Sequence, residues 1–375
     1  MVLSGALAQK PSNAGHSWVF LNWLLGFRRL GWEVLFLDSL TPEMSDGPIG
    51  QSENLAYLVS TMASFGMGDD WSLFDRSDGC LIAGLTRAEV LGRLRGADFV
   101  LNVSGYLVDE ELLAAARRRV YLDIDPGFGQ MWRERGLHDP FAGHDAFVTV
   151  AENIGRPDCG IPTCGLEWIT TRQPVVLDLW PARTGDAMTY TSVGSWRGPF
   201  DPVEYHGKTY GLRVHEFRKF VHLPGLTGEE FELALDIHEA ETPDLDLLRR
   251  EGWRLVAPQT VAGAPYSYRD YIGQSRAEFM VAKNMYVDTR GGWFSDRSAC
   301  YLASGRPVLA QDTGITSLYP TDEGLLTFST VEEAASGIEA ISGNYLRHAG
   351  AARQIAEEFF DSDKVLAELL DKLSA

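Results

Sequence analysis

The segment Gly291–Gly314 limits the possible folds of this chain more than any other, because it joins a glycine loop, a helix and a buried strand. The two glycines at its start let the backbone turn and approach a ligand without a Cβ atom in the way. Ser295 or Asp296 is then expected to cap a helix that ends at Gly305. The apolar run 307–310 predicts a buried parallel strand. The segment therefore predicts an α/β protein.

The start of this helix is expected to bind an anion. Free N–H groups and the helix dipole attract phosphate there, although cations are normally disfavoured. Arg297 lies in this first turn, and either an anionic ligand or a salt bridge to a neighbouring carboxylate explains it. Residues 311–314 follow the carboxyl end of the strand, where open α/β sheets bind ligands.

The run from Gly292 to Asp312 resembles the donor-binding signature of bacterial glycosyltransferases with the GT-B fold. Segments 271–283 and 352–370 resemble the carboxyl-terminal domain of the same family, the glycosyltransferase group 1 type, whereas the first half of the chain matches loosely. The resemblance implies two Rossmann-like domains whose parallel sheets face a central cleft. It also implies a carboxyl-terminal helix that crosses back to the first domain.

Alternating strands and helices agree with this α/β fold class. In the first half we expect a helix over 17–30 and strands over 2–7, 34–37, 99–103, 120–124 and 147–150. In the second half we expect strands over 190–193, 231–235, 255–257, 279–281, 308–310 and 325–328. The expected domains are an acceptor-binding domain 1–178, a nucleotide-sugar-binding domain 179–357 and a carboxyl-terminal helix 358–375.

The composition excludes several partners. A net charge of −19 would repel nucleic acid and anionic membranes, so an anionic donor must meet a local positive patch, for which Lys283, Arg290 and Arg297 are candidates. The four cysteines lack a metal-ligand spacing, so reduced thiols are expected. No apolar segment is long enough for a membrane span, and no signal peptide is recognisable. We therefore predict a cytoplasmic protein, and a homodimer is left open.

His16 is the predicted catalytic base. It follows Gly15 at the start of the first helix, and a reference pKa of about 6.5 leaves a neutral fraction that can take a proton from an acceptor hydroxyl. Many GT-B enzymes place a histidine in this first loop, as the resemblance implies. The alternative is that His16 only caps the helix or bonds to the backbone.

Asp123 and Asp125 lie two residues apart at the end of a predicted strand, so both carboxylates could face the same way. Three readings stay open: a divalent metal site, orientation of His16 or the acceptor by Asp123, and a strand-end turn. Metal is the least favoured reading, because GT-B enzymes generally neutralise the diphosphate with basic residues and a helix start. We therefore predict no metal and no required cofactor beyond the donor.

Further donor contacts are predicted from the resemblance, some with structural alternatives. Tyr271 could contact the donor or simply pack in the core. Glu278 and Lys283 could contact the donor or form ordinary salt bridges. The full set of predicted donor-binding residues is Gly194, Ser195, Gln259, Tyr271, Glu278, Lys283, Gly292, Ser295, Arg297, Ser298, Asp312 and Thr313.

The expected function is transfer of a sugar from a UDP- or dTDP-sugar to a hydroxyl acceptor, such as a natural product or a glycan. Family members that retain configuration carry two glutamates seven residues apart around the donor helix, and 298–309 contains no glutamate. His16 alone favours an inverting reaction. The alternatives are a nucleotide-sugar epimerase or a phosphorylase-like enzyme of the same fold, and an inactive protein that binds a sugar or a nucleotide.

Overall fold

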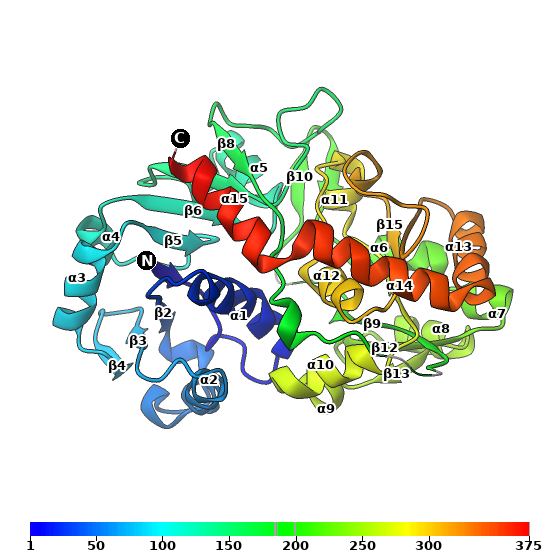
Figure 1. Ribbon diagram of the computed structural model, residues 1–375, viewed down its shortest axis with the longest axis horizontal. Helices are drawn as coiled ribbons and strands as arrows, with labels where there is room; N and C mark the ends of the chain where they lie inside the picture. Colours follow the sequence, from blue (N-terminus) through cyan, green and yellow to red (C-terminus); the bar gives the residue numbers. More distant parts are fainter. Residues whose placement is uncertain (184, 186, 199, 375) are drawn as a thin grey trace.

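The computed structural model describes residues 1–183, 185, 187–198 and 200–374. In this part of the chain the first half forms an eight-stranded sheet in the order β4-β3-β2-β1-β5-β6-β7-β8 (Figure 1). Its strands are β1 (Val2–Ser4), β2 (Leu35–Leu40), β3 (Trp71–Asp75), β4 (Leu81–Gly84), β5 (Val100–Val103), β6 (Arg119–Asp123), β7 (Ala146–Thr149) and β8 (Trp168–Thr170). Neighbouring strands are parallel except β3 and β4, which pair antiparallel.

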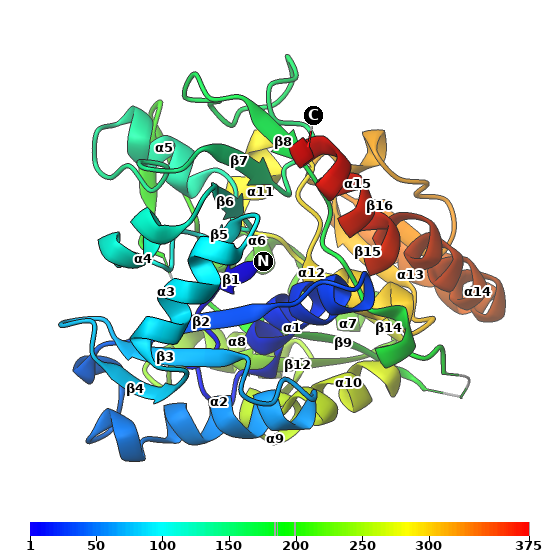
Figure 2. The same ribbon diagram turned by 60° about the vertical axis from the view of Figure 1, so that its left-hand side comes forward.

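Helices cover both faces of this first sheet, as its parallel strands require. They are α1 (Ala14–Arg29), α2 (Glu53–Ser64), α3 (Arg87–Gly96), α4 (Glu110–Ala115) and α5 (Phe128–Glu134). Leu3 and Phe36 pack in one core with residues of α1 and α2, whereas Val2 and Leu35 pack in another with residues of α3 and α4 (Figure 2). The alternation of side chains along each strand therefore places α1 and α3 on opposite faces.

The predictions for the first half are confirmed for α1, β1, β2, β5, β6 and β7, but β3, β4 and β8 were missed. β4 is an edge strand whose four residues are all at least partly exposed, and β8 has only three residues, so neither gives a strong apolar run. β3 is buried, but its polar residues Ser72 and Asp75 interrupt the pattern.

The second half forms a parallel sheet in the order β13-β12-β9-β14-β15-β16, together with an antiparallel hairpin of β10 and β11. The strands are β9 (Thr189–Ser195), β10 (Val203–Tyr205), β11 (Lys208–Tyr210), β12 (Glu230–Asp236), β13 (Arg254–Val256), β14 (Ala277–Met280), β15 (Val308–Gln311) and β16 (Leu325–Phe328). All strands of the sheet were predicted to within a few residues, whereas the hairpin was not.

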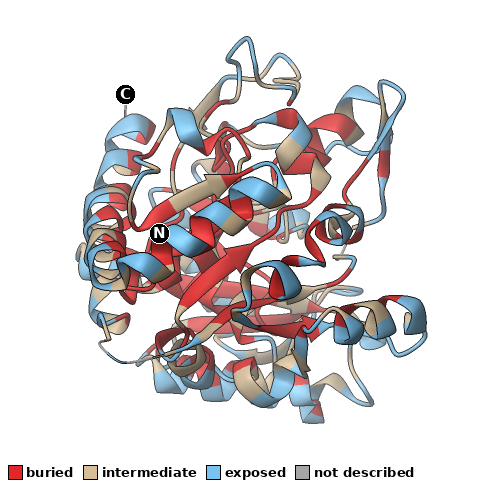
Figure 3. Cartoon of the chain, turned by 90° about the vertical axis from the view of Figure 1, so that its right-hand side faces the viewer, coloured by how far each residue is buried: buried red, intermediate tan, exposed pale blue. Residues whose placement is uncertain are grey.

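The helices of the second half enclose its sheet. They are α6 (Arg213–Phe217), α7 (Leu223–Thr227), α8 (Thr242–Arg250), α9 (Pro258–Ala262), α10 (Pro265–Gly273), α11 (Asn284–Thr289), α12 (Asp296–Ala303), α13 (Val331–Gly343), α14 (Tyr345–Ile355) and α15 (Ser362–Ser374). Short 3₁₀ turns occupy η1 (Pro42–Met44), η2 (Ile49–Gln51), η3 (Leu177–Leu179), η4 (Arg218–Phe220) and η5 (Ile315–Ser317), and a π-helical segment η6 (Ala356–Phe360) follows α14. In Figure 3 the strands are largely buried and the outer helices expose one face.

The carboxyl-terminal helix α15 crosses back to the first half of the chain, as the resemblance implied (Figure 1). Leu366 and Leu369 of α15 belong to the core of the first sheet, and Leu366 lies close against Gly26 of α1. Arg29 of α1 pairs with Asp363 at 2.9 Å. The fold class is thus the predicted one. The first sheet ends at Thr170 and the second begins with β9, but the predicted boundary at 178/179 stays a prediction.

Candidate active site between the two sheets

A cavity of about 460 Å³ lies where the loops after strands of both sheets meet, which is a usual volume for a small-molecule site. Both halves of the chain line it. Its lining includes Lys10, Asn13, His16, Asp125, Gly194, Ser195, Arg213, Asp236, Gln259, Tyr268, Lys283, Tyr286, Trp293, Ser295, Asp296 and Arg297. We refer to this cavity as the cleft. Six of the predicted donor-binding residues, Gly194, Ser195, Gln259, Lys283, Ser295 and Arg297, line it together with His16.

His16 lies half-buried in the first turn of α1, with its backbone N–H bonded to the capping side chain of Asn13. Its Nε2 lies 2.8 Å from the carbonyl oxygen of Ala6. A carbonyl only accepts hydrogen bonds, so Nε2 carries the proton and Nδ1 is the basic nitrogen. Burial, and secondly the charge of Lys10, lowers the pKa of His16 to about 3. The imidazole is therefore neutral at physiological pH.

This neutral imidazole predicts a pH dependence of stability. The folded pKa is about 3, and the unfolded value is about 6.5, so below pH 6.5 the unfolded chain binds a proton that the folded chain does not. Between pH 7 and pH 5, His16 should thus remove about 1–2 kcal/mol from the free energy of unfolding. Urea unfolding at both pH values should show a smaller loss in His16→Asn than in the wild type.

The exposed His138 offers a control for this measurement. His138→Asn should lose as much stability between pH 7 and pH 5 as the wild type does. An equal loss in the His16→Asn and wild-type proteins would show that the His16 imidazole titrates in the folded state as it does in the unfolded state.

Lys283 is held in place by an acid and by aromatic rings. Its ammonium lies 3.3 Å from Asp125 Oδ1 and within 6 Å of the ring centres of Phe128, Phe200 and Tyr286. Asp125 also accepts a hydrogen bond from the hydroxyl of Tyr286. Burial alone would raise the pKa of this carboxyl, but the charge of Lys283, with the Tyr286 hydrogen bond, holds it below its usual value. The charge of Lys283 is therefore already shared with a carboxylate.

Arg297 forms the salt bridge that was one of its two expected explanations. Its Nε donates to Glu278 Oε1 at 2.5 Å, and its Nη1 donates to the carbonyl oxygen of Val193 at 2.7 Å. Glu278 is fully buried at β14 and does not line the cleft, whereas Arg297 does. Arg297 thus ties α12 to β9 and β14. A direct contact with the donor stays a prediction for both residues.

Arg213 is a cleft residue that the sequence analysis missed. It begins α6, next to Gly194, and among the described residues its side chain has no hydrogen bond or ion pair. Burial, and secondly the nearby charge of Arg297, lowers the pKa of Arg213 to about 10. The charge of Glu278 opposes this shift, but no described carboxylate forms an ion pair with Arg213. The sequence analysis missed Arg213 because it follows the hairpin of β10 and β11, which was not predicted, and no motif marks its position.

Lys10 is the second cleft cation without a partner among the residues described. It lies in the loop after β1, and burial lowers the pKa of its ammonium. An unpaired cation at a partly buried site is costly, since a charge loses its hydration there. Lys10 and Arg213 therefore approach the cleft from the two halves of the chain as charges that an anionic ligand would neutralise.

The glycine loop at Gly291 and Gly292 contacts the first half of the chain. Gly292 has a left-handed φ of 75° and packs against Asn153, whose side-chain amide donates to the carbonyl oxygens of Arg290 and Gly314. These glycines thus permit close packing between the two halves. Gly292 does not line the cleft among the described residues, and its predicted contact with the donor stays a prediction.

Four more of the predicted donor residues lie outside the lining of the cleft. Asp312 bonds to the N–H of Gly314 and pairs with Arg290, and Thr313 donates to the carbonyl oxygen of Trp293. Tyr271 donates to Glu232 at 2.7 Å, and Ser298 is fully buried in α12. Ser295, which does line the cleft, occupies the N-cap position of α12, although its side chain makes no capping bond to a described residue. These roles also stay predictions.

The carboxylates of Asp123 and Asp125 turn to different partners. Asp123 is buried and accepts hydrogen bonds from Gln130 at 2.6 Å and Thr149 at 3.1 Å, away from the lining of the cleft. Burial raises its pKa to about 7. Within the described residues, no group of three or more potential ligands is arranged to hold a metal ion. The predicted part of Asp123 in orienting His16 or the acceptor stays a prediction.

The sequence matches no protein-family model and no curated protein. Solved structures match over the full length. AviGT4, a glycosyltransferase involved in avilamycin A biosynthesis, is 13% identical with a TM-score of 0.57, over 99% of this chain and 96% of its own. An alpha-glucosyltransferase in complex with UDP and a 13-mer DNA is 12% identical with a TM-score of 0.61, over 100% and 99%. Anabaena HepE, in complex with UDP and glucose, is 12% identical with a TM-score of 0.60, over 100% and 98%.

These full-length matches agree with the topology described above. Two parallel sheets meet at a cleft, and the last helix returns to the first half of the chain. None of the described helices has the length and apolar character needed to cross a membrane. The whole chain therefore has the GT-B fold of these glycosyltransferases.

Proposed function

We propose that this protein is a glycosyltransferase that transfers a sugar from a UDP-sugar to a hydroxyl group of a glycan or natural product. The observation that carries the proposal is that the side chains of Lys10 and Arg213 line the cleft of a GT-B fold without a hydrogen bond or ion pair among the described residues, in a chain of net charge −19. A diphosphate supplies the missing negative charge. HepE and the alpha-glucosyltransferase, which share the fold, hold UDP in their structures, and this supports a uridine donor.

In the proposed reaction, Nδ1 of His16 takes the proton of the acceptor hydroxyl. The acceptor oxygen then bonds to the anomeric carbon of the sugar, and the bond from that carbon to the diphosphate oxygen breaks. Arg213, Lys10 and Lys283 stabilise the negative charge that develops on the departing UDP. The imidazole is unprotonated when the acceptor arrives, as a base must be, but its lowered pKa makes it a weak base in the ligand-free protein.

We propose that protein cations take the place of a metal at the diphosphate. Arg213 and Arg297 are near enough for the charge of Arg297 to lower the pKa of Arg213, so both approach one region of the cleft. We also place the reaction in the cytoplasm. The four cysteines are free thiols, which fits a reducing compartment.

UDP should stabilise the protein measurably. A ligand that binds only the folded state raises the unfolding midpoint, and at 100 times its dissociation constant it adds about 2.7 kcal/mol. A thermal-shift series with UDP, dTDP, GDP and ADP should therefore give the largest shift with UDP. Uridine is the control for the diphosphate, since it lacks the charge that Arg213 and Lys10 would bind, and its shift should be much smaller.

The same series separates the alternatives. Equal shifts for all four nucleotides, or none, would contradict a uridine-specific donor site. UDP binding together with turnover of UDP-glucose in the absence of any acceptor would favour an epimerase. UDP binding without turnover under any acceptor would favour an inactive binding protein.

A further inference from the structure

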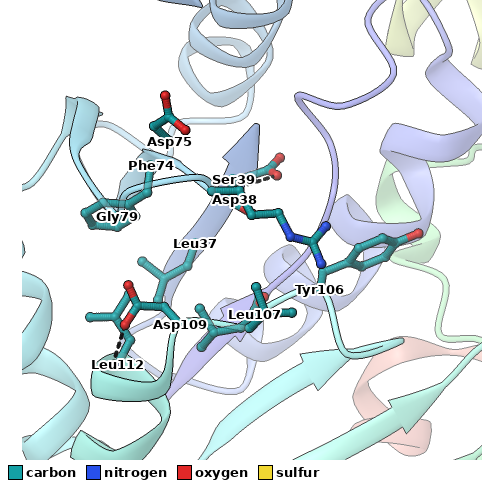
Figure 4. Close-up of a pocket in the computed structure, with 13 residues that line it drawn as sticks. Leu37, Asp38, Ser39, Phe74, Asp75, Gly79, Tyr106, Leu107, Asp109 and Leu112 are labelled. Atoms are coloured by element: carbon teal, nitrogen blue, oxygen red, sulfur yellow. Dashed lines mark hydrogen bonds between the residues drawn. The ribbon is translucent and has the colours of Figure 1, made fainter. Parts of the chain in front are cut away.

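A second cavity, of about 100 Å³, lies in the first half of the chain at the carboxyl ends of β1, β2 and β3, outside the lining of the cleft (Figure 4). We call it the β2 pocket. It is lined by Ser4, Leu37, Asp38, Ser39, Phe74, Asp75, Arg76, Gly79, Tyr106, Leu107, Val108, Asp109 and Leu112. Its position matters because open α/β sheets bind ligands beyond the carboxyl ends of their strands.

One side of the β2 pocket is apolar. Leu37, Phe74, Leu107 and Leu112 all belong to the core between the first sheet and the helices α3 and α4. In Figure 4 the side chains of Leu37, Leu107 and Leu112 lie close together on one side of the pocket. A rigid apolar wall along a space of this size favours a ring-sized apolar group over a chain of hydroxyls.

The charged groups of the β2 pocket differ in how well they are already satisfied. Asp38 accepts from the N–H groups of Ala8 and Ser39, and burial raises its pKa to about 8, so this acid is largely protonated at neutral pH. Asp75 accepts from the N–H of Ser77. The third carboxylate, Asp109, is paired with the guanidinium of Arg87 and accepts the N–H of Leu112, so each acid has a donor.

Arg76 is the exception. Its half-buried side chain forms no hydrogen bond or ion pair within the part of the chain that the structure describes, although its backbone N–H is bonded to Leu40. A forked guanidinium without a partner beside an apolar pocket matches a ligand that is apolar at one end and anionic at a substituent.

Tyr106 lies near both the β2 pocket and the cleft. It lines the pocket, and its ring packs edge-on against Phe20, which in turn packs edge-on against His16 at 5.0 Å between ring centres. Burial raises the pKa of Tyr106, followed by the charges of Asp125 in the cleft and of Asp38 in the pocket. Both sites therefore lie near this one residue.

We propose that the β2 pocket is an acceptor subsite that binds a ring-sized apolar group bearing an anionic substituent, with Arg76 as the partner of the anion. This assignment rests on the proposed function, in which His16 activates the hydroxyl of the same acceptor. It narrows the acceptor class to acidic ring compounds, such as hydroxylated aromatic acids or their derivatives.

The test uses two probes of the same shape, 4-hydroxybenzoate and its neutral isostere 4-hydroxybenzamide. Ligand-observed NMR titrations should give about tenfold tighter binding of the benzoate, because only its carboxylate forms a charge-assisted pair with Arg76. Arg76→Gln should reduce this preference to about twofold or less and leave the affinity for the benzamide unchanged.

A bulky side chain at the mouth of the pocket should block both probes. Val108 lines the pocket and is 46% exposed, so Val108→Trp adds volume there without removing a core contact. Val59 on α2 has a similar exposure of 43% and lies away from the pocket, which makes Val59→Trp the matched control. Thermal midpoints and UDP shifts of every variant are measured on the same preparations.

Equal binding of the two probes by the wild type, or binding that Val108→Trp leaves unchanged, would overturn the proposal. UDP binding without probe binding would place the failure in the β2 pocket alone. Probe binding that is lost in Val108→Trp, without any UDP shift, would uphold the pocket as a ligand site and place the failure in the donor proposal.

Discussion

Arg213→Met should weaken UDP binding by about 10–100-fold, because charge-assisted hydrogen bonds contribute about 1.5–3 kcal/mol and each 1.4 kcal/mol is tenfold. The same substitution should stabilise the ligand-free protein by about 1 kcal/mol, since an unpaired cation at a partly buried site is unfavourable. The guanidinium has no partner among the described residues, so its removal breaks no contact within them. Opposite signs for stability and for affinity are the signature of a ligand-binding charge.

Gly194→Ala offers a second route to the same effect without a change of charge. A Cβ atom at Gly194 would collide with Nη1 of Arg213, so alanine should displace the guanidinium and also weaken UDP binding. Lys208→Met is the control, because Lys208 is exposed on the hairpin and does not line the cleft.

Calorimetric titration at one ionic strength gives the affinity for UDP of Arg213→Met, Gly194→Ala and Lys208→Met. Urea unfolding gives the stability of the same three variants. If Arg213→Met bound UDP as tightly as the wild type, Arg213 would have no part in the donor site.

The second sheet could be predicted from the sequence because its strands follow simple physical rules. β15 and β16 are short, mostly apolar runs that follow Gly305 and Gly324, and the strands of a parallel sheet covered by helices read as nearly continuous apolar runs. α15 was predicted equally well, because Leu366, Leu369 and Leu373 recur at helical spacing. Local patterns therefore identified most elements of the fold.

The site was harder to predict because it depends on contacts between distant segments. His16 and Lys283 were found, since a helix start and a family signature mark them. Arg213 was missed, because its position over Gly194 follows from the hairpin that precedes it. The packing of Gly292 against Asn153 was also missed, because Asn153 lies in the other half of the chain. No spacing along the chain reveals such pairs.

Glu278→Gln should strongly destabilise the protein. Glu278 is fully buried, and its Oε1 accepts from Arg297 at 2.5 Å. Removing one partner of a buried ion pair leaves the other charge uncompensated, and this costs about 3–5 kcal/mol. Urea unfolding followed by tryptophan fluorescence should show this loss in the free energy of unfolding.

Glu368→Gln is the control, because Glu368 is exposed and pairs with Lys372 at 2.8 Å and Arg172 at 3.6 Å, and a surface ion pair contributes about 0–1 kcal/mol. The double variant Glu278→Leu with Arg297→Met should recover most of the lost stability, since it removes both buried charges together. A loss below about 1 kcal/mol in Glu278→Gln would mean that the buried charge of Arg297 does not depend on Glu278. Recovery of stability in the double variant, combined with weaker UDP binding than in the wild type, would show that Arg297 both braces α12 and contacts the donor.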